Sequence, residues 1–359
     1  MFKAVVAQTG IFAGALAVSL SFVFSPTSAS ARPRETITPT EMQLRLAELQ
    51  QEPWSTRTGS GIADWAGDCD EHAAKIEITD PATRAKRVVK LLLRRPDSSK
   101  KVPVMVIVPT IDGVTSIEHS MGSQFCDAGI AVVVADVIDR TLPSVMPGWG
   151  LEDRVNRAAI LAVRTVLDFA ETNDHFDKNK IGMIGASLGG MSTALISGVE
   201  ADRLKAIVIA VGAGNLPYAL AYSTNKEITE LRERRMENLG ITDPAQYEEP
   251  LRQTVRYDPL FFASQVKRER IMMVMGEADV TMPYMIQQET FEAFGRPTQE
   301  LYSTGHVATI AAMTFWYFNN VIDFVKTRFD GKAPAMDKRI NVQNQNILRF
   351  DGLDLSVDL

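Results

Sequence analysis

Stretches of almost continuous apolar residues recur along the middle of the chain and predict buried strands. They lie at 102–108, 130–137, 181–184, 204–211 and 271–275. Strands that are apolar at nearly every position are buried on both faces, as in parallel sheets. Stretches with a helical spacing of apolar residues lie between them, at 153–172, 188–199 and 285–294. This alternation predicts an α/β fold, with a mostly parallel central sheet and helices on both of its faces.

The segments on either side of this region have different patterns. In the N-terminal half, 75–78 and 88–93 predict two antiparallel strands with turn residues between them. A helix is predicted at 40–51 ahead of them, and one long apolar helix at 307–329 after the last expected strand. The polar residues 330–359 form either an arm or a disordered tail.

The segment between the strands at 204–211 and 271–275 interrupts the alternation, because it holds no convincing strand pattern. Its clearest feature is a highly charged helical stretch at 227–239. Insertions at the carboxyl ends of strands commonly lie over a binding site. We therefore predict that 212–266 forms a helical cap over a substrate pocket. The alternative is a solvated helix that only connects two strands.

Residues 1–31 have the pattern of a secretory signal peptide. The basic Lys3 is followed by an apolar run at 11–24 and by the small-residue cleavage pattern Ala29-Ser30-Ala31. The run is short for a membrane span, although an uncleaved membrane anchor is the alternative. We expect an exported protein, periplasmic or secreted, with no membrane span in its mature form.

The composition is that of a globular protein with an acidic balance. The chain has 359 residues, 45% of them hydrophobic and 23% charged, which suffices for a large single core. A net charge of −6 gives no electrostatic footprint for nucleic acid. Cys69 and Cys126 are the only cysteines, and in an oxidising compartment they can form a disulfide. A free buried thiol at Cys126 is an equal alternative.

The candidate chemistry centres on Gly185-Ala186-Ser187-Leu188-Gly189-Gly190. These residues follow a predicted strand and open a predicted helix, which is the setting of the G-x-S-x-G nucleophile elbow. The tight turn holds the serine hydroxyl clear of the sheet, and the helix N-terminus points at the reacting oxygen. So short a motif also occurs by chance, and a Gly-rich turn that binds phosphate is the alternative.

A serine nucleophile needs a base and an acid, and chain order selects candidates for both. In enzymes with this elbow the order is Ser, then Asp or Glu, then His. Of the four histidines only His306 follows Ser187, and it precedes the last predicted helix. Asp279 lies in the loop after the strand at 271–275, where open α/β sheets place their sites. Glu277 is the rival acid in the same loop, and capping of the next helix is the structural alternative.

These motifs resemble the α/β-hydrolase superfamily, esterase type, near its dienelactone-hydrolase and acyl-peptidase-like branch. The resemblance covers residues 74–329 and implies an α/β-hydrolase fold in which Ser187, Asp279 and His306 are catalytic. It leaves 32–73 as an N-terminal extension. Besides the elbow, the residues that carry the resemblance are Asp258-Pro259-Leu260, Gly276-Glu277-Ala278-Asp279 and Gly305-His306.

The resemblance also implies an oxyanion hole made of backbone N–H groups. One donor is Leu188, directly after the nucleophile, and the second is Thr110 or Ile111. Pro109 in the same loop has no N–H to donate. Many relatives carry His-Gly at this place, and this chain does not. The nearby Asp112 would oppose a developing negative charge, so we expect it to point away from the hole.

Four aromatic residues are candidates for lining the substrate pocket. Trp149 belongs to the loop at 141–150, and Tyr218, Tyr222 and Tyr284 are expected on the cap side. Ordinary packing explains such aromatic residues equally well.

The sequence therefore predicts an exported serine hydrolase that cleaves a small-molecule carboxylic ester through a Ser-His-Asp triad and an acyl-enzyme. This chemistry requires neither a metal nor an organic cofactor. A serine peptidase or amidase of the same fold ranks second, because oligopeptidase relatives usually carry a large β-propeller ahead of the hydrolase domain. A non-catalytic binding protein ranks lower, because no triad member is missing. Acyl and alcohol specificity and the oligomeric state are not assigned by any pattern.

Overall fold

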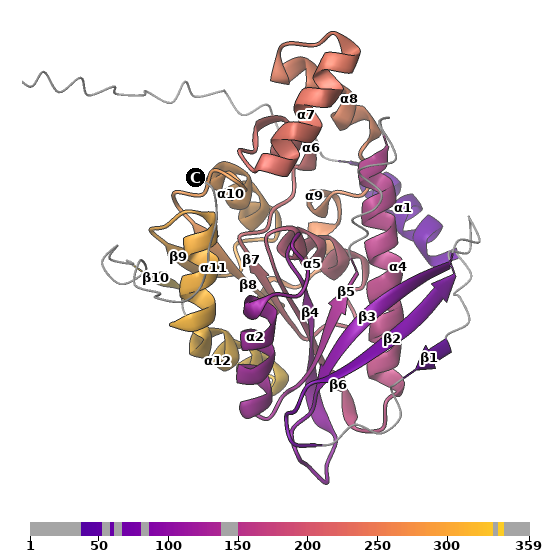
Figure 1. Cartoon of the computed structure of the whole chain (residues 1–359), viewed down its shortest axis with the longest axis vertical. Helices are drawn as coiled ribbons and strands as arrows, with labels where there is room; N and C mark the ends of the chain where they lie inside the picture. The colour runs from indigo at the N-terminus through magenta and orange to yellow at the C-terminus, as the bar shows by residue number, and fades with distance from the viewer. Residues whose placement is uncertain are drawn as a thin grey trace, which may run out of the picture. The chain divides into compact units, whose positions relative to one another are not determined.

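The computed structural model describes residues 37–51, 58–60, 67–79, 86–137, 150–332 and 337–340 (Figure 1). The predicted signal peptide lies outside these residues. No helix in the described part of the chain is long and apolar enough to cross a membrane.

The strands of the described part form one sheet, in the order β1-β2-β3-β5-β4-β6-β7-β8-β9-β10. Strand β2 lies between β1 and β3 and pairs antiparallel with each, and β3 pairs antiparallel with β5. Every further pair, from β5 to β10, is parallel, as the apolar strands predict. The bounds are β1 Thr58–Ser60, β2 His72–Thr79, β3 Lys86–Arg94, β4 Val102–Val108, β5 Ala131–Asp136, β6 Phe176–Ala186, β7 Ala206–Ala210, β8 Ile271–Gly276, β9 Thr298–Tyr302 and β10 Lys338–Ile340.

Helices cover both faces of this sheet (Figure 1). The helices α1, α4, α5 and α10 pack on one face, and α2, α11 and α12 pack on the other. Strand β4 is apolar at nearly every position because both of its faces are covered. Val106 packs in the apolar core on the α4 face and Ile107 in the core on the α12 face, and both side chains are fully buried. The helix bounds are α1 Pro39–Gln51, α2 Ser116–Asp127, α4 Leu151–Thr172, α5 Leu188–Val199, α6 Leu216–Tyr222, α7 Lys226–Leu239, α8 Pro244–Thr254, α9 Pro259–Phe262, α10 Tyr284–Ala293, α11 His306–Phe315 and α12 Phe318–Phe329; two short 3₁₀ turns, Ala263–Gln265 and Arg268–Arg270, precede β8.

The prediction of one helix over 307–329 is wrong, because the segment forms two helices. The chain leaves helical geometry at Trp316 and Tyr317, where both backbone N–H groups donate to the Ala312 carbonyl. This break turns the chain so that α12 can place its own apolar face, including Phe318 and Phe324, in the core. The four residues at the break, Phe315 to Phe318, are all aromatic, so the apolar pattern could not reveal it.

The folded body also reaches beyond the predicted limits of 74–329. Helix α1 lies ahead of them and buries Leu49, whose carbonyl accepts a hydrogen bond of 2.7 Å from Arg164 of α4. Strand β10 lies after them and extends the sheet beside β9. The first of these segments is the helix predicted at 40–51, and the second is a three-residue strand; both are held by contacts with the rest of the fold.

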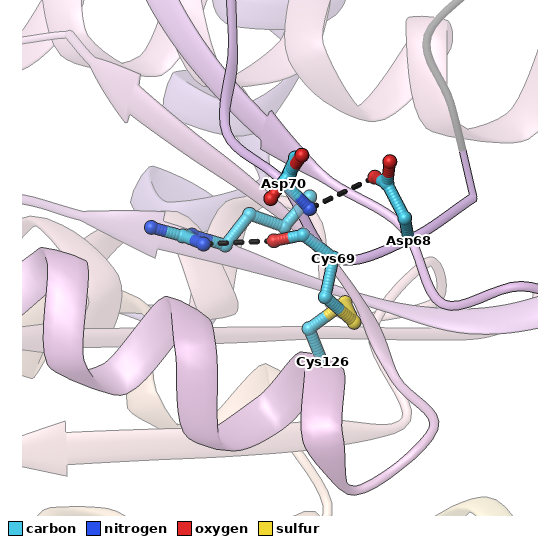
Figure 2. The surroundings of a disulfide bond; sticks show 5 residues. Asp68, Cys69, Asp70 and Cys126 are labelled. Carbon is cyan, nitrogen blue, oxygen red and sulfur yellow. Dashed lines mark hydrogen bonds between the residues drawn. A yellow bond between two sulfur atoms is a disulfide. The ribbon is translucent and has the colours of Figure 1, made fainter.

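A disulfide joins Cys69, just ahead of β2, to Cys126 in the last turn of α2 (Figure 2). Their Cα atoms are 5.8 Å apart, and no cysteine is free. Of the two alternatives open from the sequence, the bridge is therefore confirmed. The Cys69 carbonyl also accepts a hydrogen bond of 2.8 Å from Arg94 of β3, so the segment is held at the sheet by more than the bridge.

Candidate active site

Ser187 occupies a sharp turn between the end of β6 and the start of α5. Its φ of 56° and ψ of −122° lie in a region that residues with a side chain rarely adopt. Both backbone groups of Ser187 are hydrogen-bonded. Its N–H donates to the Ala210 carbonyl of β7, and its carbonyl accepts from the Met191 N–H. Strain of this kind persists only where the surroundings enforce it.

The glycines around Ser187 are required by close backbone approach. A Cβ at Gly185 would lie 2.2 Å from the Gly189 carbonyl oxygen, and a Cβ at Gly189 would lie 2.2 Å from the Val108 carbonyl oxygen. Real side chains do not approach backbone atoms so closely, so any larger residue would push β4, β6 and α5 apart. The G-x-S-x-G pattern therefore has a steric origin in this fold.

The structure brings Ser187, His306 and Asp279 together in one chain of hydrogen bonds. The Ser187 Oγ lies 2.8 Å from His306 Nε2, and His306 Nδ1 lies 2.7 Å from Asp279 Oδ2. Each residue lies at or just beyond the carboxyl end of a parallel strand: β6, β8 and β9. In this geometry the imidazole can accept the serine proton while the carboxylate fixes the ring.

Asp279 is almost fully buried, and each of its oxygens has further partners. Its Oδ1 accepts from the N–H groups of Thr281 and Met282, at 3.0 and 2.9 Å. Its Oδ2 accepts from His306 and from the side-chain amide of Gln287, at 2.9 Å. These partners satisfy a buried carboxylate and set its orientation toward the imidazole.

Gln287 of α10 is a site residue that our sequence reasoning missed. It is fully buried, and its amide nitrogen donates to Asp279 and to the Met282 carbonyl, while its oxygen accepts from the Gly276 N–H. It thereby joins the end of β8 to the acid loop. The available signal was a polar residue on the apolar face of a helix that begins beside the expected acid.

His306 is the first residue of α11 and follows Gly305, its extended N-cap. Two backbone hydrogen bonds hold the loop that precedes His306. The Ala278 N–H donates to the Thr304 carbonyl, and the Thr309 N–H donates to the Gly305 carbonyl. The imidazole is largely covered, with 10% of its side chain exposed. Its position therefore depends on the acid loop and on the first turn of α11 together.

The rival acid Glu277 points elsewhere. It pairs with Arg339 of β10 at 2.5 Å and is partly exposed, and no hydrogen bond joins it to His306 among the described residues. Geometry therefore favours Asp279 as the partner of the imidazole.

Of the two predicted second donors of the oxyanion hole, the structure commits Thr110 to another contact. Its N–H donates to the buried carboxylate of Glu118 at 3.1 Å, and one N–H cannot serve a second strong acceptor equally well. Because Glu118 engages the Thr110 N–H, we keep Ile111 as the expected second donor beside Leu188. Leu188 is the first residue of α5, where backbone N–H groups have no acceptor within the helix. Asp112 is exposed.

The helices α6, α7 and α8 lie together beyond the end of the sheet that holds the site (Figure 1). Their shared core includes Met191 of α5, one turn after the nucleophile, with Leu220 of α6 and Tyr247 of α8. The end of α6 also contacts the acid loop, because Ser223 donates to the Thr281 carbonyl at 2.7 Å. The segment is thus packed directly on the nucleophile helix and the acid loop.

Two buried acidic residues hold this segment in place: Asp258 joins its two ends, and Glu152 fixes α7 to the body. Asp258 accepts the N–H groups of Asn215, Leu216 and Leu260, at 2.7–3.0 Å. Burial raises the pKa of Asp258, and these three donors oppose that effect. Farther out, Arg235 of α7 donates to Glu152 of α4 at 2.6 Å, and both side chains are buried.

Three of the four expected pocket residues lie in the described part of the chain. Tyr218 and Tyr222 stack on α6 with ring centroids 4.5 Å apart, and Tyr218 packs against an apolar cluster that includes Met282 of the acid loop. Burial, with the nearby Glu248 carboxylate, raises the pKa of both tyrosines. Tyr284 instead donates to Gln288 along α10 at 3.2 Å, and Trp149 lies outside the described residues.

Comparison with known proteins agrees with this architecture. A model of the prolyl oligopeptidase family, Peptidase_S9, matches residues 161–301. The chain is similar in structure to an acetyl xylan esterase from Paenibacillus sp. R4, with a TM-score of 0.63 and 17% identity over 82% of this chain and 96% of that one. It is also similar to acetyl xylan esterase 1 from Thermoanaerobacterium sp. JW/SL YS485, with a TM-score of 0.56 and 15% identity over 80% and 92% of the two chains. No curated protein matches by sequence comparison.

These comparisons define the class of protein. At such identities the structural likeness shows the fold, and the chain has the α/β-hydrolase fold. The family match, which spans the elbow and the acid loop, agrees with the expected resemblance to an esterase-type, acyl-peptidase-like α/β-hydrolase.

Proposed function

We propose that this protein is a serine hydrolase that cleaves carboxylic esters of small molecules through an acyl-enzyme. The observation that carries the proposal is the hydrogen-bond chain from Ser187 through His306 to Asp279, at 2.8 and 2.7 Å. A serine whose hydroxyl contacts a base that is itself oriented by a buried acid has the arrangement of an activated nucleophile.

The reaction would run in two halves. His306 Nε2 takes the proton from Ser187 as its Oγ attacks the ester carbonyl, and the carbonyl oxygen becomes negatively charged. The N–H groups of Leu188 and Ile111 stabilise that oxyanion. Collapse of the intermediate breaks the bond to the alcohol oxygen, which receives the proton from His306 and leaves. Water then attacks the acyl-enzyme with the same proton transfers, which releases the acid and restores Ser187.

The test is hydrolysis of p-nitrophenyl acetate by the wild-type protein and by Ser187→Ala. An acetyl ester is the first choice because two of the structural neighbours are acetyl xylan esterases. We expect the variant to lose nearly all turnover while it melts at a similar temperature. Equal turnover by the two proteins, or none by the wild type on any ester of a chain-length series, would refute the proposal.

Amide or peptide hydrolysis is the second candidate, favoured by the match to the prolyl oligopeptidase family. The same triad serves both reactions, so the discriminating measurement is kcat/KM for a p-nitrophenyl ester against the p-nitroanilide of the same acyl group. Ester hydrolysis as the main activity predicts a large excess for the ester after correction for their intrinsic reactivities. A non-catalytic binding protein would instead fail to react with a fluorophosphonate.

We also propose that α6–α9 form a cap over the substrate and that the protein is exported. The contacts of α6 with the acid loop support the first proposal. The signal-peptide pattern and the Cys69–Cys126 bridge support the second, since structural disulfides persist mainly in oxidising compartments. Mass spectrometry of the protein after expression in a bacterial host tests export: the mature chain should begin at Arg32 and leave the cytoplasm.

A further inference from the structure

Glu118 is a buried carboxylate that the proposed reaction does not use. It lies in the first turn of α2, with its side chain fully buried. Its Oε1 accepts the Thr110 N–H at 3.1 Å, and its Oε2 accepts the N–H and the hydroxyl of Thr115, at 2.8 and 2.7 Å. Part of this is a capping box, in which Thr115 caps α2 and Glu118 returns a contact to Thr115. The bond to Thr110 is not part of a capping box.

The extra bond closes the loop that carries the second oxyanion donor. Thr110 and Thr115 flank Ile111 on its two sides, and one carboxylate holds both of them. Inside the loop, the Gly113 N–H donates to the Thr110 carbonyl at 3.1 Å and forms a tight turn. The Glu118 carboxylate and this turn thus both constrain the loop around Ile111.

The clamped loop also lies against the nucleophile helix. A Cβ at Gly189 would lie 2.2 Å from the Val108 carbonyl oxygen and 2.5 Å from that of Pro109. The backbone at the start of the loop thus touches the first turn of α5, which carries Leu188. A shift of the loop changes the spacing between the two donors, on which oxyanion stabilisation depends.

The helix that carries Glu118 is itself anchored at its far end. Cys126 is bonded to Cys69, and Gln124 donates to the Thr314 carbonyl of α11 at 2.9 Å. Because α11 begins with His306, α2 is fixed relative to the element that carries the base. Glu118 therefore holds the loop at a fixed position relative to α2 and α11.

We propose that Glu118 is a positioning residue of the oxyanion hole: it occupies the Thr110 N–H and holds the loop so that Ile111 presents the second donor. This inference rests on the proposed function. A role in capping α2 alone would affect stability and not the transition state. The two roles can be separated, because Thr115 caps the helix but makes no contact with Thr110 through its own side chain.

The test compares Glu118→Gln, Thr115→Val and Glu118→Asp with wild type on p-nitrophenyl acetate. Gln keeps the size of Glu118 but supplies one acceptor oxygen, so the N–H of either Thr110 or Thr115 loses its acceptor. We expect kcat to fall about 10- to 100-fold, with KM changed less than about threefold, because an oxyanion donor acts in the transition state. Thr115→Val keeps the Thr115 N–H that donates to Glu118 and removes the hydroxyl that caps α2, so it should melt at a lower temperature and lose clearly less kcat than Glu118→Gln.

A second readout follows the oxyanion itself. The inhibition constant for a trifluoromethyl ketone, whose tetrahedral adduct carries an oxyanion, should rise in Glu118→Gln in proportion to the loss of kcat/KM. Glu118→Asp keeps the carboxylate and should lie between Gln and wild type, which also serves if the Gln variant does not fold. Thr38→Ala is the matched control, because it removes the side-chain acceptor that caps α1 away from the site.

The proposal is overturned if folded Glu118→Gln keeps wild-type kcat and inhibitor affinity, or if Thr115→Val loses as much kcat as Glu118→Gln. A rise in kcat in Glu118→Gln would also overturn it, since that result would mean that the carboxylate charge opposes the oxyanion. Failure of the proposed function is a different observation: wild type itself would then not exceed Ser187→Ala.

Discussion

Removing the Cys69–Cys126 bridge tests how much the N-terminal segment contributes to stability. The bridge closes a loop with a sequence separation of 57 residues. In the chain-entropy model, a loop of this length restricts the unfolded chain enough to stabilise the folded protein by about 4 kcal/mol. Loss of the bridge is therefore expected to remove a large share of a typical domain stability of about 5–15 kcal/mol.

The choice of substitutions matters for this measurement. Cys69 has a φ of 66°, so Cys69→Ser keeps the same backbone requirement. Cys126 is buried, so Cys126→Ala avoids burying a hydroxyl group. The double variant then differs from wild type mainly in the cross-link, together with a small loss of packing.

Urea unfolding followed by circular dichroism gives the free energy of unfolding. The double variant should lie about 3–5 kcal/mol below oxidised wild type, and wild type in dithiothreitol should approach the variant. The variant itself should not respond to reductant. Two titratable thiols in denatured, unreduced wild type, or a difference below about 1 kcal/mol, would refute the reasoning.

Three further predictions concern buried acids and their partners. Asp279→Asn should lower kcat for ester hydrolysis about 10⁴-fold, because the imidazole is then held in the wrong tautomer. Glu277→Gln should leave kcat within about twofold, since its ion pair lies at the surface. The reverse order of these two effects would assign the acid to Glu277. Gln287→Leu leaves the buried Met282 carbonyl and the buried Gly276 N–H without their partner, so the free energy of unfolding in urea should fall by about 2–6 kcal/mol. The value of kcat should be at least about tenfold lower, and an unchanged kcat in the folded variant would contradict the role of Gln287 beside Asp279. Burial raises the pKa of the Glu300 carboxyl, which accepts a hydrogen bond from Tyr302. The stability linked to this carboxyl is therefore present at low pH and is lost as the pH rises through its folded pKa. Glu300→Gln should raise the melting temperature at pH 7 but not at pH 4, and an equal shift at both pH values would contradict this.

Much of the fold follows from local pattern. Strands such as β4 and β7 are apolar at nearly every position because both faces of the sheet are covered, and the sequence shows this directly. The break between α11 and α12 does not show, since Phe315 and Phe318 fit an apolar helix as well as a turn between two helices. Strand β10 is equally hidden, because three residues carry no periodicity.

The candidate site divides in the same way. Chain order and strand position were enough to select Ser187, Asp279 and His306, which the structure joins by hydrogen bonds. The supporting residues Gln287 and Glu118 were not found, because their roles depend on which backbone groups they reach in three dimensions. Elbow and triad motifs are local or ordered along the chain, whereas the groups that orient them come from tertiary packing.

The central claim is that Ser187 is an activated nucleophile, and reaction with a fluorophosphonate tests it most directly. Intact mass should show one adduct on wild type, and peptide mapping should place it on Ser187. Ser187→Ala should remain unlabelled, and His306→Ala should react far more slowly because the serine has lost its base. Wild type that stays unlabelled, or that carries the adduct on another residue, would contradict the account.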